Sequence, residues 1–183
     1  MSQHVAPYAE KESTRTEGRE SSKGYSIRLK PIEWYLDAAD RFAVAHCGCK
    51  KVHVGCVLVN PKNGLILSSG ANRAIPNKCK SEECMRIQKY GEASKDHRLP
   101  SDCRAIHSEV DAICHCAVNT RGSYAYVTRY PCEACARALV AAGVRAVFYG
   151  RQQEISEETK HIFACGNVRV HHINNWDRED TLL

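Results

Sequence analysis

The sequence predicts a three-layer α/β domain with a central five-stranded mixed sheet, and three observations carry this prediction. A chain of 183 residues suits one domain with its own core. Two apolar runs at 54–59 and 65–70 flank the turn-forming segment 60–64, a pattern typical of an antiparallel β-hairpin. Further along the chain, strands alternate with helices, which favours parallel pairing through right-handed crossovers.

The order of the elements follows from the spacing of apolar residues. Helical spacing over 31–46 predicts an amphipathic helix ahead of the hairpin, and Pro31 marks where order should begin. The later elements are expected as a helix that starts at 106, a strand at 124–128, a helix at 131–143, a strand at 146–149, a helix at 155–165 and a strand at 168–173.

Polar segments set the limits of the domain. Residues 1–29 lack aliphatic periodicity, so we expect a disordered N-terminal tail there. The domain is then expected at 30–175, with 176–183 as a C-terminal tail. Residues 71–104 form a polar, irregular insertion that is long for a structureless loop, so something is expected to hold it in place.

Composition limits the classes of function. Twenty-six basic and 21 acidic residues give a net charge of +5, which suits an anionic substrate without requiring nucleic acid. No apolar run approaches the roughly 20 residues of a membrane span, and the N-terminus lacks a signal-peptide core. Eleven cysteines in such a chain point to thiols and metal ligands in a reducing compartment. We therefore expect a cytoplasmic protein without a membrane partner.

Two short segments carry the chemistry: His107-Ser108-Glu109 and Pro131-Cys132-Glu133-Ala134-Cys135. One imidazole and two thiolates are a ligand set of catalytic zinc sites, which keep a fourth position open for water. A helix that starts near Cys132 would favour thiolate over thiol through its dipole. Glu109 places a carboxylate beside the metal without being needed as a ligand. The alternatives are a closed structural zinc site, or a histidine and two cysteines that are simply core residues. Neither alternative would explain the presence of Glu109.

The pattern His-x-Glu followed by Pro-Cys-x-x-Cys is the signature of zinc-dependent nucleobase deaminases. From Ile32 to Ile173 the chain resembles the cytidine deaminase superfamily, and within it the deoxycytidylate (dCMP) deaminase family. The resemblance implies the cytidine-deaminase-like α/β/α fold, with catalytic zinc on His107, Cys132 and Cys135. It also implies a reaction in which Glu109 moves protons while dCMP is converted to dUMP, the precursor for dTMP synthesis.

The resemblance implies substrate contacts as well. Asn72 matches the asparagine that binds the sugar or phosphate edge of the substrate, and Arg73 could grip a phosphate. Tyr130 could stack on the base, with simple packing as the equal alternative. The family has Gly-Tyr-Asn-Gly where this chain has Gly70-Ala71-Asn72-Arg73, and it commonly has His-Ala-Glu-x-Asn-Ala-Ile where Asp111 replaces the asparagine. These departures leave the fine specificity open.

Several alternatives therefore stay open. The substrate could be dCTP or another cytosine nucleotide in place of dCMP. A second alternative is deamination of a base in RNA or single-stranded DNA, because the Asn-Arg pair also resembles tRNA adenosine deaminases. The 7% aromatic residues and the net charge of +5 give weak support to nucleic acid as a partner. A non-catalytic zinc-binding module is the alternative from a different class of protein.

The resemblance further implies a second, structural zinc that would tether the insertion. The cysteines that match the family's pattern are Cys49, Cys79, Cys84 and Cys103. Cys47, His53 or His97 could replace one of these four, and such a closed site would order the polar segment. Members of this family usually form homo-oligomers, often hexamers. Allosteric control by dCTP or dTTP is common among them, but the departures around Asn72 keep that property from transferring directly.

Overall fold

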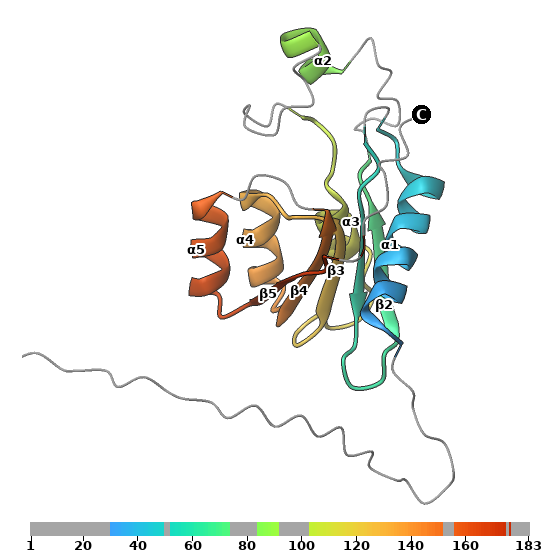
Figure 1. The fold of residues 1–183 in the computed structure, drawn as a ribbon, viewed down its shortest axis with the longest axis vertical. Helices are drawn as coiled ribbons and strands as arrows, with labels where there is room; N and C mark the ends of the chain where they lie inside the picture. Colours follow the sequence, from blue (N-terminus) through green and yellow to red (C-terminus); the bar gives the residue numbers. More distant parts are fainter. Residues whose placement is uncertain are drawn as a thin grey trace, which may run out of the picture.

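The computed structural model describes residues 30–49, 52–73, 84–91, 103–151, 156–174 and 176. These residues form a five-stranded sheet in the order β2-β1-β3-β4-β5, with helices on both faces. In Figure 1, α1 lies on one side of the sheet and α4 and α5 lie on the other. The predicted three-layer α/β architecture is confirmed. The predictions for 1–29, Cys79, His97 and 177–183 lie outside the described residues.

The sheet is mixed, as predicted. β1 (Gly55–Val59) and β2 (Ile66–Ala71) form the expected antiparallel hairpin, and β1 also pairs antiparallel with β3 (Tyr124–Arg129). β4 (Ala146–Arg151) and β5 (Arg169–His172) then add in parallel to β3. One helix lies between β3 and β4 and another between β4 and β5. Parallel neighbours need such a connection because the chain must cross back over the sheet before the next strand begins.

The helices occupy nearly the predicted positions. They are α1 (Ile32–His46), α2 (Met85–Tyr90), α3 (Ser108–Cys114), α4 (Glu133–Ala141) and α5 (Glu157–Cys165). The short helix α2 lies inside the insertion, where only irregular structure was expected. Helices α3 and α4 each begin two residues later than predicted, so that a residue of each zinc-binding motif stands at the N-cap.

Two hydrophobic clusters fill the space on the two faces of the sheet. Side chains of β1 alternate between them: Cys56 and Leu58 join the cluster under α3, α4 and α5, whereas Val57 and Val59 join the cluster under α1. All five residues of β1 are buried. A central strand covered on both faces must be apolar throughout, which explains the unbroken apolar run in the sequence.

Two glycines let helices lie directly against the sheet, and one of them positions the site. A Cβ at Gly70 would lie 2.2 Å from the carbonyl oxygen of Ser108 and 2.3 Å from the backbone nitrogen of Ala112. The first turn of α3 therefore packs on the backbone of β2. A Cβ at Gly55 would lie 1.9 Å from the carbonyl oxygen of Ala39, so α1 approaches β1 in the same way.

Trp176 corrects the predicted C-terminal limit of the domain. The residue was assigned to a tail, yet its side chain is only 4% exposed and belongs to the cluster under α1. Its indole packs on Gly150, and its Nε1 donates a hydrogen bond of 2.8 Å to Asp37. A single aromatic residue after a polar stretch carries no periodicity, so the sequence does not show that it is buried.

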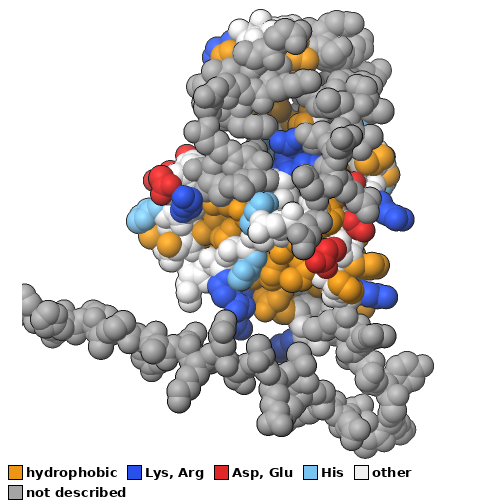
Figure 2. Space-filling model, viewed as in Figure 1, with side chains coloured by type: hydrophobic (Ala, Val, Ile, Leu, Met, Phe, Trp, Pro, Cys, Tyr) orange, Lys and Arg blue, Asp and Glu red, His pale blue; other side chains and the backbone are white. Residues whose placement is uncertain are grey.

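The visible surface of the described residues is mixed in charge. Figure 2 shows Lys and Arg side chains at separate places among acidic and hydrophobic ones on this face. Among the helices that the structure describes, none has the length and apolar character needed to cross a membrane.

Candidate active site

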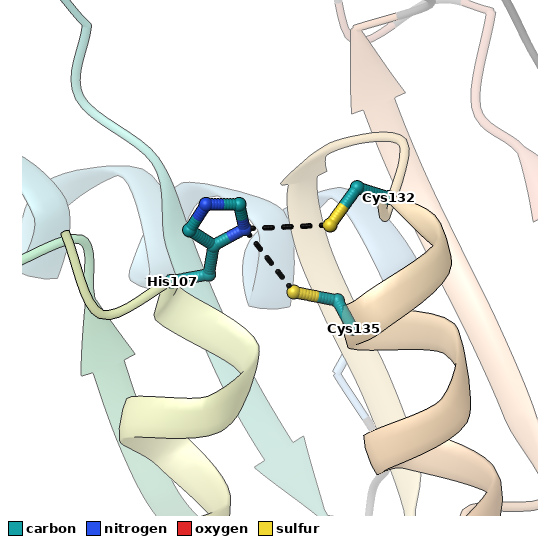
Figure 3. Close-up of side chains that lie close together, drawn as sticks. All are labelled: His107, Cys132 and Cys135. Carbon is teal, nitrogen blue, oxygen red and sulfur yellow. Dashed lines mark hydrogen bonds between the residues drawn. The ribbon is translucent and has the colours of Figure 1, made fainter. Parts of the chain in front are cut away.

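The predicted zinc ligands meet where two helices begin. His107 is the N-cap residue of α3, and its extended backbone (φ −76°, ψ 152°) turns the chain into the helix. Cys132 is the N-cap residue of α4, and Cys135 lies in the first turn of that helix. Figure 3 shows the imidazole of His107 facing both sulfur atoms across the gap between the two helix starts.

The geometry of these three side chains fits a zinc ion. Nδ1 of His107 lies 3.5 Å from Sγ of Cys132 and 3.3 Å from Sγ of Cys135, and the three ligand atoms lie within 4.8 Å of one another. Nitrogen and sulfur ligands at tetrahedral zinc distances are separated by about 3.6 Å. The side chains are thus arranged to accept the metal with only small adjustments.

The electrostatics of the site favour a thiolate. Hydrogen bonds from Cys135 and from His107 lower the pKa of Cys132 to about 3, against the opposing effect of burial. The hydrogen bond to Cys132, together with burial, raises the pKa of Cys135 well above its usual range. The separate hydrogen bond between His107 and Cys132 raises the pKa of His107.

Glu109 lies beside these ligands in the first turn of α3. Its side chain is 3% exposed, its carboxylate accepts a hydrogen bond of 3.0 Å from the hydroxyl of Ser108, and it interacts electrostatically with Cys135. Burial raises the pKa of this carboxyl above its usual range, although the nearby His107 opposes the shift. A carboxyl with a raised pKa can both accept and release a proton near neutral pH, as general acid–base chemistry requires.

The sequence matches the family described as the cytidine and deoxycytidylate deaminase zinc-binding region over residues 29–151. The chain belongs to this deaminase family. The match includes both helix starts and Glu109, so the family and the geometry indicate the same site. The protein is accordingly a hydrolytic deaminase, an enzyme that replaces an amino group with oxygen from water.

Curated relatives and solved structures agree with this assignment. The deaminase is 32% identical to the deoxycytidylate deaminase of Mus musculus over 141 residues, which cover 73% of this chain and 76% of the mouse protein. It is 28% identical to ComE operon protein 2 of Bacillus subtilis (strain 168) over 152 residues, 79% of this chain and 74% of that protein.

Among solved structures, the dCMP deaminase of the cyanophage S-TIM5 in complex with dCMP and dUMP matches with a TM-score of 0.59 at 24% identity. The match covers 80% of this chain and 100% of that one. It shows that the deaminase has the cytidine-deaminase-like fold.

Asn72, predicted to contact the substrate, is buried in a hydrogen-bond network. Its Oδ1 accepts from the backbone nitrogen of Val54 and from the thiol of Cys47, both at 2.8 Å. Its Nδ2 donates to the carbonyl oxygen of Val52 at 2.9 Å. In this arrangement Asn72 holds the segment ahead of β1, and a contact with substrate stays a prediction.

Arg73 and Asp111, two departures from the family pattern, contact each other. Nε of Arg73 donates to Oδ2 of Asp111 at 2.8 Å, and the same oxygen accepts from the backbone nitrogen of Ala71 at 3.0 Å. The carboxylate is 1% exposed. Arg73 also forms an isolated β-bridge with Ile106, the residue before His107. The pair thus ties the end of β2 to the helix that carries Glu109. In the sequence, the signal for this contact is that one of the two residues that depart from the family pattern is basic and the other is acidic.

Tyr130 lies in the core under α4 and α5. Its ring makes edge-to-face contacts with Tyr149 and Phe163, at centroid distances of 4.9 and 6.4 Å, and burial raises its pKa to about 12. Packing accounts for this position, and stacking on a base stays a prediction.

The predicted ligands of a second zinc are only partly described. Cys84 is buried, Cys49 and Cys103 are half-buried, and Cys79 lies outside the described residues. Burial raises the pKa of Cys47 to about 11, so the thiol that donates to Asn72 keeps its proton.

Proposed function

We propose that this deaminase uses one zinc ion to convert dCMP to dUMP, a step that supplies the precursor of dTMP. The observation that carries the proposal is the buried carboxylate of Glu109 beside three zinc-ligand atoms at two helix starts. A purely structural metal site would not need that carboxylate. The names of the mouse and other deoxycytidylate deaminase relatives support dCMP as the substrate.

The proposed reaction assigns zinc binding and proton transfer to different residues. His107, Cys132 and Cys135 would hold the zinc, which when bound lowers the pKa of water and so supplies a nucleophile at neutral pH. Glu109 would carry one proton of that water to the ring nitrogen and the other to the amino group as it leaves. The sum is dCMP plus water giving dUMP plus ammonia.

Substrate recognition follows from the same proposal. We assign Asn72, Arg73 and Tyr130 to the surroundings of the nucleotide. A net charge of +5 suits an anionic nucleotide, and the scattered basic side chains in Figure 2 lend no support to a long nucleic-acid track on that face of the described residues.

The first experiment is deamination followed by ultraviolet absorbance with dCMP, dCTP, deoxycytidine and an adenosine-containing tRNA anticodon hairpin. Loss of the cytosine chromophore with dCMP alone is the expected result, and Glu109→Ala serves as the blank. Turnover of dCTP alone would move the substrate to the triphosphate. Turnover of the hairpin alone would overturn the proposal in favour of RNA editing.

The second zinc is a separate proposal for Cys49, Cys79, Cys84 and Cys103. Two zinc ions per chain are expected by elemental analysis, and one is expected in Cys84→Ser. One ion per chain in both proteins would reject the second site without affecting the catalytic one. Homo-oligomerisation, allosteric dCTP or dTTP, and a cytoplasmic location stay predictions. Light scattering at several protein concentrations measures the first of these.

A further inference from the structure

Ser108 places a hydroxyl against the carboxylate of Glu109. The residue opens α3 and is completely buried, and its Oγ donates a hydrogen bond of 3.0 Å to Oε2 of Glu109. Consecutive residues of a helix project in different directions, so their side chains seldom meet. Here the two side chains do meet, in the first turn of the helix and next to the proposed zinc ligand His107.

The backbone that carries this hydroxyl is firmly placed. The carbonyl oxygen of Ser108 lies against Gly70 of β2, where a Cβ would approach it to 2.2 Å. The backbone nitrogen of Asp111 bonds to the carbonyl oxygen of His107 at 2.9 Å and closes the first turn of α3. Because β2 and α3 are packed too closely to shift, the Ser108 hydroxyl can hold the Glu109 carboxylate in one orientation.

The hydroxyl of Ser108 is the one group that an alanine at this place would lack. A methyl group fills the same buried space but cannot donate a hydrogen bond. Burying a hydroxyl costs free energy unless it has a partner, and Glu109 is the partner here.

We propose that Ser108 is a positioning residue for the deamination reaction: its hydroxyl holds the Glu109 carboxylate in the orientation that faces the zinc ligands. The inference rests on the proposed role of Glu109 as the proton carrier. A carboxylate that must exchange protons with three different atoms works best when its orientation is fixed in advance.

A matched control separates positioning from a general loss of packing. Ser68 is a second buried serine, and its Oγ donates a hydrogen bond of 2.7 Å to the carbonyl oxygen of Ala112, also in α3. Ser68→Ala removes a buried hydroxyl that braces the same helix but does not touch Glu109. Both variants should therefore lower the melting temperature, and only one of them should lower turnover.

The kinetic test compares the zinc-loaded wild type, Ser108→Ala and Ser68→Ala. For Ser108→Ala we expect kcat for dCMP to fall by about 10- to 100-fold, the range for losing one hydrogen bond to a charged group, with KM and zinc content nearly unchanged. For Ser68→Ala we expect kcat to stay within about twofold of the wild type. Equal losses in both variants, or no loss in Ser108→Ala, would overturn the proposal.

Crystal structures of the wild type and Ser108→Ala test the same idea without a substrate. The Glu109 carboxylate should occupy one conformer next to Ser108 Oγ in the wild type, and a displaced or divided position in the variant. An unchanged carboxylate would refute positioning even if the enzyme is active. If the carboxylate moves but the wild type does not deaminate dCMP, the proposed substrate fails and the positioning role stands.

Discussion

At the scale of single residues, the site combines a metal-ligand set with one buried acid. Glu109 is 3% exposed and lies beside Cys135. Burying a carboxylate costs folding free energy, so a buried acid in this place indicates a chemical role. This burial distinguishes the site from a surface cluster of the same residue types.

Glu109→Gln should keep the fold and the zinc but abolish most turnover. The amide has nearly the same shape as the carboxylate but cannot carry protons, so kcat should fall by about 100-fold or more. Zinc analysis and thermal melting of the same sample provide the control. Turnover close to that of the wild type would remove Glu109 from the proposed chemistry.

Cys132→Ser should lose zinc. One of the three protein ligands of the catalytic zinc becomes a weaker one, so the zinc content should fall by about one ion per chain after dialysis against a mild chelator, and turnover should disappear with it. Cys114→Ser is the matched control because Cys114 is exposed on α3. Full zinc retention in Cys132→Ser would contradict the assignment of the ligand.

At the scale of elements, the position of α3 on β2 decides where Glu109 lies. Gly70 allows close contact between the two backbones, and Asp111 anchors the helix to the end of the strand through Ala71 and Arg73. The carboxylate of Asp111 is 1% exposed, so its partners matter more than those of a surface acid.

Arg73→Gly should destabilise the protein, and Arg73→Gly/Asp111→Asn should recover part of the loss. The single variant deprives a buried carboxylate of a charged partner, at a cost of about 1–3 kcal/mol in the free energy of unfolding. The double variant restores the residue types of the family pattern and removes the buried charge. Urea unfolding of the zinc-loaded proteins measures both effects. A double variant less stable than the single one would show that the pair is not coupled in this way.

At the scale of the whole molecule, Trp176, the last residue that the structure describes, contacts both the sheet and α1. Its indole lies on Gly150, its Nε1 donates to Asp37, and the guanidinium of Arg151 lies 5.3 Å from its ring. Arg151 in turn pairs with Asp40 of α1 at 3.5 Å. Trp176 therefore belongs to the core under α1.

Trp176→Ala should lower the free energy of unfolding by about 3–5 kcal/mol, the usual range for removing a buried tryptophan. Trp176→Phe keeps most of the packing and loses mainly the hydrogen bond to Asp37, so it should lose only about 1 kcal/mol. Chemical denaturation of the two variants measures the difference. Equal, small losses in both would show that the indole is not part of the core.

Much of this protein could be predicted from sequence because the signals are local. Apolar patterning located the five strands and four of the five helices that the structure describes, and two short motifs predicted His107, Cys132 and Cys135 as ligands, which the structure brings together. The six-residue helix α2 was missed because it is short and polar and buries none of its residues. Periodicity cannot detect such an element.

Tertiary structure alone decided the contacts between distant residues. Arg73 and Asp111 are 38 positions apart, and Asp37 and Trp176 are 139 apart. In neither pair does the separation in sequence indicate a contact, because the distance in space between such residues depends on how whole helices and strands pack. The sequence by itself predicted the metal ligands and the acid of this deaminase, and the three proposed ligand side chains do lie together. Only the packing of α3 on β2 decided how the acid is held, since that orientation depends on backbones brought together across the fold.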